Sequence, residues 1–221
     1  MTIFDIMGPV MIGPSSSHTA GAARIGRMAR RLLGAKPVKA EILLHGSFAA
    51  TGEGHGTDRA LVAGILDLRP DDPRLPQACE LAGEAGLEFT IGKTHLQGAH
   101  PNTALVNLTG EGGEKLALRG VSLGGGRARV EAIDDIETSF SGDMPTLIIR
   151  NRDLPGQVHE VTGALSRRRV NIATMRLFRD KRGGLAVMVI ESDQPIDPEV
   201  VKELRAQPGI VKATYLNMTE E

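Results

Sequence analysis

The stretch Thr146-Leu147-Ile148-Ile149-Arg150 is a short apolar run that is typical of a buried strand, and the pattern after it decides the fold of this part of the chain. Pro155 opens the first of two helical patterns, because proline is favoured in the first turn of a helix. The expected elements are a helix at 155–169, strands at 170–179 and 185–191, a helix at 198–206 and a strand at 210–217. The order strand–helix–strand–strand–helix–strand predicts a ferredoxin-like unit, with two helices on one face of an antiparallel sheet.

A second region precedes this one and differs from it in composition. The break lies near residues 141–145, and the region before it is rich in glycine and holds five of the six histidines. Apolar residues recur at helical spacing over residues 18–34. The other expected elements are a helix at 57–67 and strands at 38–46, 87–91, 103–109, 115–122 and 128–133. We therefore predict an α+β chain with two domains, at residues 1–143 and 146–221.

The composition excludes several classes of protein. The 221 residues are 41% hydrophobic and 24% charged with a net charge of -1, which favours a globular protein and disfavours a nucleic-acid binder. No apolar run is long enough to span a membrane, and residues 1–5 lack a secretion signal, so we expect a cytoplasmic protein. The single cysteine, Cys79, cannot hold an iron–sulfur cluster by itself, so any cluster needs ligands from another chain.

The stretch Gly13-Pro14-Ser15-Ser16-Ser17-His18-Thr19-Ala20-Gly21 is the richest in reactive side chains. Four hydroxyls and an imidazole occupy residues 15–19, which we call the serine turn. They precede a helix whose first N–H groups are unpaired, and such a helix end attracts carboxylate or phosphate. Capping of the helix by Ser16 or Ser17 would need only one serine, so we predict that the serine turn binds a ligand.

A second segment places histidine among glycines. His45-Gly46-Ser47-Phe48 leads into residues 51–59, where glycines at 52, 54 and 56 let the backbone pass close to a ligand. His55 and Asp58 fall at the start of the next expected helix. The plain alternative is a glycine-rich loop that is capped by Thr57 or Asp58 and binds nothing.

A third segment joins a turn to a strand at residues 98–103. Pro101 forces His100 out of the helical region, so that His100 and Asn102 enter the strand in an extended conformation. An imidazole and an amide in this position suit the orientation of a small polar substrate, although a turn for folding alone is the alternative. The glycines at 124–126 are expected to be structural.

Two further possibilities concern metals and effectors. The histidines of the three segments lack the spacing of a zinc motif, so we expect no metal site in this chain. In the C-terminal region, polar residues and a glycine flank the first helix, and they would suit an amino-acid effector or belong to a plain dimerisation module. These residues are Asp153, Gly156 and Asn171.

Taken in order, these segments resemble a known family. Residues 12–21, 45–48, 54–58, 100–103 and 122–126 are similar to motifs of the beta chain of bacterial iron–sulfur-dependent L-serine dehydratase, also called L-serine ammonia-lyase. The C-terminal region resembles an ACT domain, a small amino-acid-sensing module. The N-terminal region is also similar to the allosteric-substrate-binding domain of some phosphoglycerate dehydrogenases, in which such loops need not be catalytic.

The resemblance implies the conversion of L-serine to pyruvate and ammonia. It implies a [4Fe-4S] cluster that is ligated by a partner alpha chain and not by this chain, with one iron that acts as a Lewis acid on the serine hydroxyl. It implies that His18 transfers the α-proton and that His55 and Asp58 fix the surrounding loops. The implied substrate-binding residues are Ser15, Ser16, Ser17, Thr19, His100 and Asn102. It further implies dimerisation through the ACT domain, around an effector that would include serine itself.

Two alternatives stay open at this point. The first is a regulatory amino-acid-binding subunit that does no chemistry. The similarity to the allosteric-substrate-binding domain and the ACT-like C-terminal region would both fit such a subunit. A histidine-metal hydrolase would require stoichiometric zinc in the isolated chain. A partner alpha chain and activity only on mixing would favour the enzyme.

Overall fold

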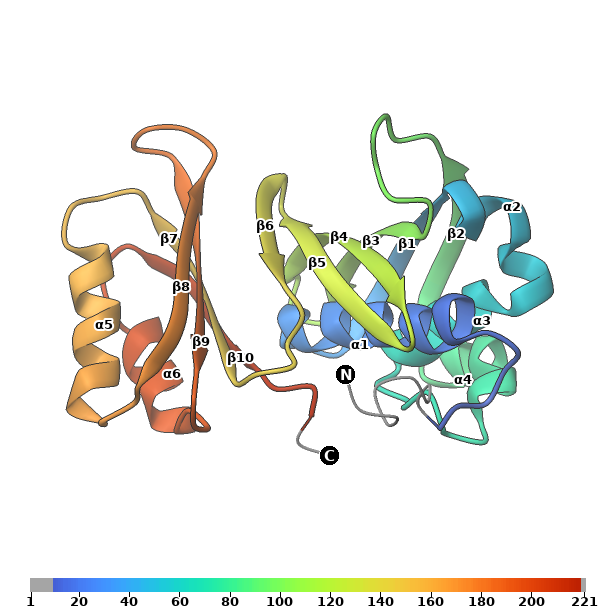
Figure 1. Cartoon of the computed structure of the whole chain (residues 1–221), viewed down its shortest axis with the longest axis horizontal. Coiled ribbons are helices and arrows are strands. Elements are labelled where there is room, and N and C mark those ends of the chain that lie inside the picture. The colour runs from blue at the N-terminus through green and yellow to red at the C-terminus, as the bar shows by residue number, and fades with distance from the viewer. Residues whose placement is uncertain (1–9, 220–221) are drawn as a thin grey trace. The chain divides into compact units, whose positions relative to one another are not determined.

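The computed structural model describes residues 10–219. The chain divides between Asp134 and Asp135 into two compact units (Figure 1). The break that the sequence predicts near residues 141–145 follows the strand β6 (Ile136–Phe140). Among the described residues, no helix is long and apolar enough to cross a membrane. The expectation about a secretion signal concerns residues 1–5 and lies outside the described part of the chain.

The first unit is built on a mixed sheet in the order β2-β1-β3-β4-β5, and β6, which follows the division at Asp134, continues this sheet at its edge. The strands β1 and β2 run parallel, whereas the pairs β1–β3, β3–β4 and β4–β5 are antiparallel. The strands are β1 (Pro37–His45), β2 (Glu88–Thr94), β3 (Thr103–Gly110), β4 (Lys115–Gly124) and β5 (Arg127–Ile133), with β6 at the edge. The α+β class and the expected strands are therefore confirmed, and β6 is a strand that the sequence analysis missed.

The helix α1 (Gly21–Leu33) packs on the sheet, and a turn of π-helix, η2 (Ser16–Ala20), leads into it. The predicted apolar stripe of α1 is buried, and Gly34 ends the helix in the left-handed conformation. The cap differs from the prediction, because Ser15 and not Ser16 or Ser17 accepts a backbone N–H at the start of η2. The turn Ser16–Ala20 continues directly into α1, so the packing of α1 holds the serine turn in place.

The helix α3 (Thr57–Ile65) crosses α1 at two glycines. A Cβ atom on Gly64 would lie 2.0 Å from the carbonyl oxygen of Ala23, and one on Gly26 would lie 2.3 Å from that of Leu61. Only glycine permits backbones to approach so closely, because any larger residue would push the helices apart. The crossing fixes the start of α3 relative to the serine turn.

Residues 46–55 differ most from the sequence-based expectation. They form a helix, α2 (Gly46–His55), and not a glycine-rich loop. Intrinsic propensity disfavours a helix that contains three glycines, but propensity is a weak prior that packing overrides. Here Phe48 is fully buried, and the Thr51 hydroxyl donates to the Ser47 carbonyl one turn earlier at 2.9 Å. A short helix, α4 (Ala78–Glu84), carries Cys79.

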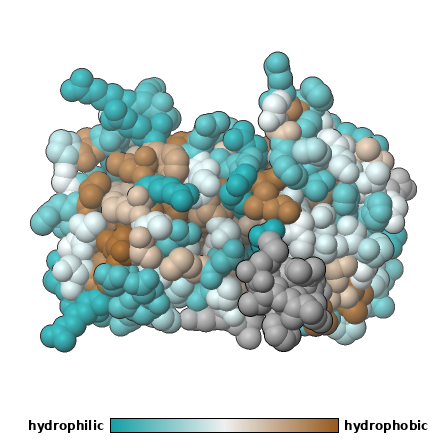
Figure 2. All heavy atoms as spheres, in the orientation of Figure 1, coloured by the Kyte–Doolittle hydropathy of each residue, from teal (hydrophilic) through white to brown (hydrophobic). Residues whose placement is uncertain are grey.

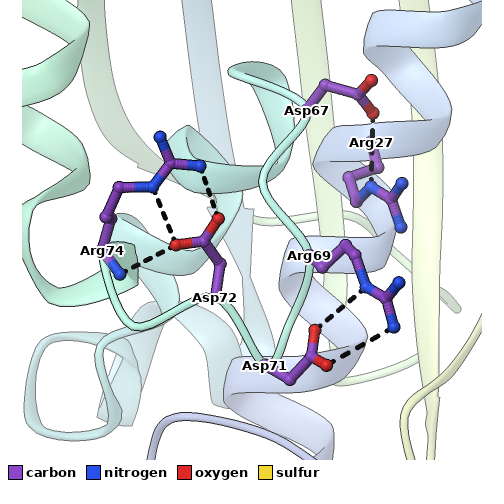
Figure 3. A network of polar contacts seen from close by, with 6 residues as sticks. All are labelled: Arg27, Asp67, Arg69, Asp71, Asp72 and Arg74. Atoms are coloured by element: carbon purple, nitrogen blue, oxygen red, sulfur yellow. Dashed lines mark hydrogen bonds and ion pairs between the residues drawn. The ribbon is translucent and has the colours of Figure 1, made fainter.

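The segment after α3 is held by ion pairs (Figure 3). Arg27, whose side chain is only 6% exposed, reaches from α1 to the carboxylate of Asp67 at 3.3 Å. Two local pairs follow, Arg69–Asp71 at 3.1 Å and Arg74–Asp72 at 2.7 Å. Hydrogen bonds from the Arg74 side chain lower the pKa of Asp72 to about 2. The Arg27–Asp67 pair joins the segment to α1, whereas the two local pairs lie within the segment.

The second unit has the predicted ferredoxin-like arrangement. Its antiparallel sheet has the order β10-β7-β9-β8. Its elements are β7 (Thr146–Arg152), α5 (Gln157–Arg167), β8 (Ile172–Arg179), β9 (Leu185–Ser192), α6 (Pro198–Arg205) and β10 (Ile210–Leu216). Apolar residues of both helices and of the sheet form one core, which includes Leu147, Val161 and Leu204.

The start of α5 is a small departure from the expectation. The helix begins at Gln157, after Gly156 in the left-handed conformation with φ of 90°, and not at Pro155. Figure 2 shows apolar patches among the hydrophilic residues over this unit, at the left of the view. The large apolar residues that are exposed here are Leu154, Val158, Leu177, Leu185 and Val211.

Candidate functional site

The serine turn exposes one face and buries its end. Ser15 enters it with extended backbone, and its Oγ accepts the amide N–H of His18 at 3.1 Å. The amide of Thr19 donates to the carbonyl of Ser15 at 2.8 Å. Thr19 is 1% exposed, whereas residues 15–18 are half-buried. The hydrogen bonds close the turn, residues 15–18 stay partly accessible to a ligand, and Thr19 does not.

The imidazole of His18 rests against one face of α2. Its Nε2 lies 3.0 Å from Ser47 Oγ and 3.1 Å from Thr51 Oγ1. Its Nδ1 lies on the other side, 3.5 Å from Ser15 Oγ. The ring meets Phe48 edge to face at a centroid distance of 5.3 Å and His55 at 4.9 Å. The side-chain atoms within hydrogen-bonding distance of the ring nitrogens in these contacts are all neutral hydroxyls.

This environment favours the neutral imidazole. Burial lowers the pKa of His18 below its ordinary value of 6.5, the neighbouring His55 lowers this pKa further, and a hydrogen bond with the Ser47 backbone opposes both effects. A neutral imidazole keeps a lone pair for a proton near neutral pH. The serine turn can therefore supply a base.

The third sequence segment lies beside the start of α2. Gly46 has φ of 58°, and a Cβ atom there would come within 2.7 Å of Pro101. The amide of Ser47 donates to the Pro101 carbonyl at 2.8 Å. His100 Nδ1 accepts the amide N–H of Asn102 at 3.1 Å, so a neutral His100 carries its proton on Nε2 and acts as a donor.

The fourth segment, at the end of β4, holds the serine turn from the other side. Ser122 Oγ donates to the Ser17 carbonyl at 2.9 Å, and the Gly126 amide donates to the Ser16 carbonyl at 3.2 Å. The amide of Ser122 in turn donates to the Asn102 carbonyl at 3.0 Å. Four segments that are far apart in the sequence therefore meet at one place.

His55 and Asp58 differ in their links to the turn. The carbonyl of His55 accepts the Thr19 hydroxyl at 3.1 Å, and its Nδ1 contacts the Thr51 carbonyl at 3.0 Å. The proton of the Thr19 hydroxyl is thus used to join the turn to α2, which leaves only its oxygen for a ligand. The buried Oδ1 of Asp58 has no hydrogen-bond partner among residues 10–219.

A pocket of about 210 Å³ opens beside the turn. Thr19, His55 and Arg59 line it, together with Ile12, Gly13, Pro14, Gly54, Gly56, Leu75 and Pro76. Arg59 is exposed and brings a positive charge to a space that is large enough for a small amino acid. Arg59 lies in the segment 51–59 that stood out in the sequence, but it was assigned no role there.

Ser47 and Thr51 are the main residues that the sequence analysis missed. They lie at helical spacing with His55, four residues apart each time, and so share one face of α2. This spacing was visible in the sequence, but it has a meaning only for a helix, and residues 46–55 were expected to be a loop.

The described residues do not form a site for an iron–sulfur cluster. Cys79 is a free cysteine, and burial raises the pKa of its thiol, with a further contribution from Asp58. Among the side chains that the structure describes, no three histidine, cysteine or acidic groups gather as metal ligands. A cluster bound through this chain alone therefore does not fit its donor set.

The three predicted effector residues of the second unit do not lie together within one chain. Asp153 precedes α5 and Gly156 caps it, whereas Asn171 follows the end of the helix. The eleven residues of α5 separate the two ends by roughly 16 Å. The amide of Asn171 donates to Gln194 at 3.3 Å. A site that uses both ends of α5 therefore needs more than one copy of this unit.

Asp153 is already paired inside the unit. Its Oδ2 accepts the Gly183 amide and the Arg179 guanidinium, each at 3.0 Å. The Gly183 amide and then Arg179 lower the pKa of the Asp153 carboxyl below its ordinary value of 3.8. The carboxylate therefore ties the β7–α5 loop to the β8–β9 hairpin.

Comparison with known proteins agrees with the resemblance seen in the sequence. The family model of the serine dehydratase beta chain matches residues 2–132, and that of the ACT domain matches residues 145–209. The chain is 41% identical to the probable L-serine dehydratase, beta chain, of Bacillus subtilis strain 168, and the match covers 97% of each chain. It is 35% identical to the L-serine dehydratase, beta chain, of Peptoniphilus asaccharolyticus, again over 97% of each.

A second group of relatives has a different name. The chain is 28% identical to the D-3-phosphoglycerate dehydrogenase of Archaeoglobus fulgidus over 89% of this chain and 37% of that protein. The match takes in most of this chain but little more than a third of that longer protein.

Proposed function

The chain belongs to the serine dehydratase beta-chain family and ends in an ACT domain, and from this we propose that its serine turn binds L-serine for conversion to pyruvate and ammonia. The observation that supports the proposal is the meeting of four separate segments at the serine turn, which carries the half-buried imidazole of His18. Elimination of water from serine requires a base for the α-proton, donors that hold the carboxylate and acceptors that hold the ammonium group. The aminoacrylate that results tautomerises to an imine, and hydrolysis of the imine gives pyruvate and ammonia.

The geometry supports a separate role for each segment. His18 is the proposed base, because its partners are neutral hydroxyls and its pKa is lowered by burial and by His55. The hydroxyls of Ser15, Ser16 and Ser17 are proposed to hold the polar groups of the substrate. His100, which is fixed as an Nε2–H donor, and Asn102 are proposed to orient it.

Arg59 is the proposed partner of the substrate carboxylate. It is the cationic residue among those that line the pocket beside Thr19 and His55. A guanidinium pairs with a carboxylate through two parallel hydrogen bonds and so fixes its orientation. This places the carboxylate at the start of α3, where the helix dipole also favours a negative charge.

We further propose that the [4Fe-4S] cluster lies on a partner alpha chain. The relatives' designation as beta chains implies such a partner. Cys79 offers only one thiol, and its raised pKa disfavours the thiolate that a metal needs. In this proposal the present chain binds and orients the substrate and moves a proton.

For the second unit we propose pairing with another copy around an amino-acid effector. The exposed apolar residue Leu177, on the edge strand β8, would be covered by such a partner. Asp153 and Gly156 of one copy and Asn171 of the other would then contribute to one effector site. Light scattering of the full chain and calorimetric titration with L-serine test this, and a monomer that binds no serine would contradict it.

Reconstitution tests the proposed function. The chain and its alpha partner are produced together without oxygen, and pyruvate is measured after L-serine is added. We expect pyruvate only when both chains are present. Full activity of the alpha chain alone would contradict a catalytic role for this chain.

The match to D-3-phosphoglycerate dehydrogenase supports a second candidate function, that of a regulatory subunit that binds an amino acid but does no chemistry. In that case serine would bind to this chain, and the Arg59→Ala and His18→Ala variants would change regulation but leave the rate of the partner's reaction unchanged.

A further inference from the structure

The Thr51 hydroxyl determines which nitrogen of His18 carries the proton. A hydroxyl has one proton, and Thr51 donates it to the Ser47 carbonyl at 2.9 Å. Its oxygen is also 3.1 Å from His18 Nε2. In that contact the oxygen can only accept, so Nε2 has to donate.

Ser47 occupies the same side of the ring. Its Oγ lies 3.0 Å from His18 Nε2, so the single Nε2–H proton faces two oxygen atoms from successive turns of α2. No comparable acceptor set faces Nδ1 in the hydrogen bonds of the described residues, where the contact on that side is Ser15 Oγ at 3.5 Å. The Nε2–H tautomer is the form that satisfies these contacts, and it leaves the lone pair on Nδ1.

The Ser15 hydroxyl is arranged to face that lone pair as a donor. Its oxygen already accepts the His18 amide N–H at 3.1 Å, which leaves its own proton for another partner. The distance of 3.5 Å to Nδ1 is long for a hydrogen bond, but such contacts often shorten when a substrate binds. Nδ1 thus lies on the side of the ring that faces the Ser15 hydroxyl.

His55 shows the opposite arrangement and depends on the same residue. Its Nδ1 is 3.0 Å from the Thr51 carbonyl, which can only accept, so Nδ1 of His55 carries the proton. Thr51 therefore contacts one histidine through its hydroxyl and the other through its carbonyl. Neighbouring imidazoles that are 4.9 Å apart are thereby held in different tautomers.

We infer that Ser47 and Thr51 are positioning residues that hold His18 as the Nε2–H tautomer, so that Nδ1, beside the Ser15 hydroxyl, is the atom that takes the α-proton of serine. This inference rests on the proposed function. In the step, the Cα–H bond breaks and its electron pair forms the second bond between Cα and Cβ. The β-hydroxyl leaves with the electron pair of the C–O bond, and together with the α-proton it balances as one molecule of water.

The spectroscopic experiment uses the full chain, labelled with ¹⁵N in histidine, at a pH where the rings are neutral. The His18→Gln variant identifies the His18 signals by their loss. We expect a ring proton on Nε2 and a lone-pair shift for Nδ1 in the wild type. The Nε2–H signal should disappear in the Ser47→Ala, Thr51→Val double variant and persist in Thr51→Ser, which keeps the hydroxyl.

Thr51 is exposed, so valine at this position is tolerated by the fold, and circular dichroism checks this. A ring proton on Nδ1 of the wild type would overturn the inference, as would an Nε2–H signal that survives in the double variant.

The kinetic experiment uses the chain in complex with its alpha partner. We expect Thr51→Val to lower kcat by roughly tenfold with little change in KM, and Thr51→Ser to restore it, because a misplaced base slows proton transfer more than binding. An unchanged kcat in Thr51→Val would overturn the positioning role. Absence of pyruvate from the wild-type complex would instead overturn the proposed function and the catalytic use of Nδ1, whereas the spectroscopic result would still decide the tautomer.

Discussion

The polar side chains of the serine turn and those around Asp153 in the second unit are partnered in opposite ways. His18 is surrounded by neutral hydroxyls from Ser15, Ser47 and Thr51. Asp153 is held by a guanidinium and a backbone amide. Neutral partners leave an imidazole able to gain a proton, whereas a charge pair fixes a carboxylate in one state. The first arrangement suits chemistry, and the second stabilises a loop.

Replacement of His18 should cause the largest loss of activity among the changes predicted here. Because a positioned base contributes about 10²- to 10⁴-fold to the rate, His18→Ala should lower kcat of the reconstituted complex by at least about 100-fold. The matched control is His159→Ala, which removes an exposed histidine from α5 of the other unit. The rate of pyruvate formation is measured for both variants. Equal losses of kcat would contradict the contrast between the serine turn and the second unit.

The helix crossing that supports the serine turn can be broken without touching a polar residue. A Cβ atom on Gly64 would lie 2.0 Å from the Ala23 carbonyl, so Gly64→Ala should cost about 1–3 kcal/mol of unfolding free energy. Gly83→Ala in α4 is the control, because a Cβ atom there meets nothing within 4 Å, and it should stabilise by up to about 1 kcal/mol. Thermal melting measures both, and equal shifts would show that the crossing is not tightly packed.

The pH dependence of activity tests how His55 changes the pKa of His18. The base must be neutral, so activity falls as the pH drops through the His18 pKa, which burial and His55 hold below 6.5. His55→Gln removes the electrostatic effect of His55 and should raise the His18 pKa toward 6.5, although burial still keeps this pKa below 6.5. The acid limb of the kcat/KM profile should therefore move to higher pH. A shift to lower pH would contradict the account.

The smallest effect is expected at Asp153. Its pKa is lowered in the folded chain, so its contribution to stability is present above its ordinary pKa of 3.8 and is lost as the pH falls through the lowered value. Asp153→Asn should therefore lower the melting temperature slightly at pH 7 and not at all in strong acid. A difference that is independent of pH would show that the pair with Arg179 and Gly183 is not electrostatic.

The two units also differ in how well the sequence predicts their secondary structure and strand order. The second unit alternates apolar runs and turn signals so regularly that its strand order followed from the pattern. In the first unit, α2 was missed because Gly52 and Gly54 lower helix propensity, while burial of Phe48 stabilises the helix all the same. The strand β6 was missed because only its two end residues, Ile136 and Phe140, are apolar.

The site was predictable in its parts but not in its assembly. The serine turn, His100 and Asn102 stood out by residue type. That Ser122 binds the Ser17 carbonyl depends on contacts between residues more than one hundred positions apart, which no local pattern encodes. Ser47 and Thr51 became visible as partners of His18 only once residues 46–55 were seen to be helical.

Chemical rescue tests the central claim most directly, since it asks whether an imidazole at position 18 is the group that moves the proton. The His18→Ala variant, reconstituted with its alpha partner, is assayed for pyruvate with increasing imidazole in the buffer. The account predicts a rate that rises with the imidazole concentration, while the His159→Ala complex shows no such dependence. Turnover of His18→Ala at the wild-type rate, or a low rate that imidazole never raises, would contradict it.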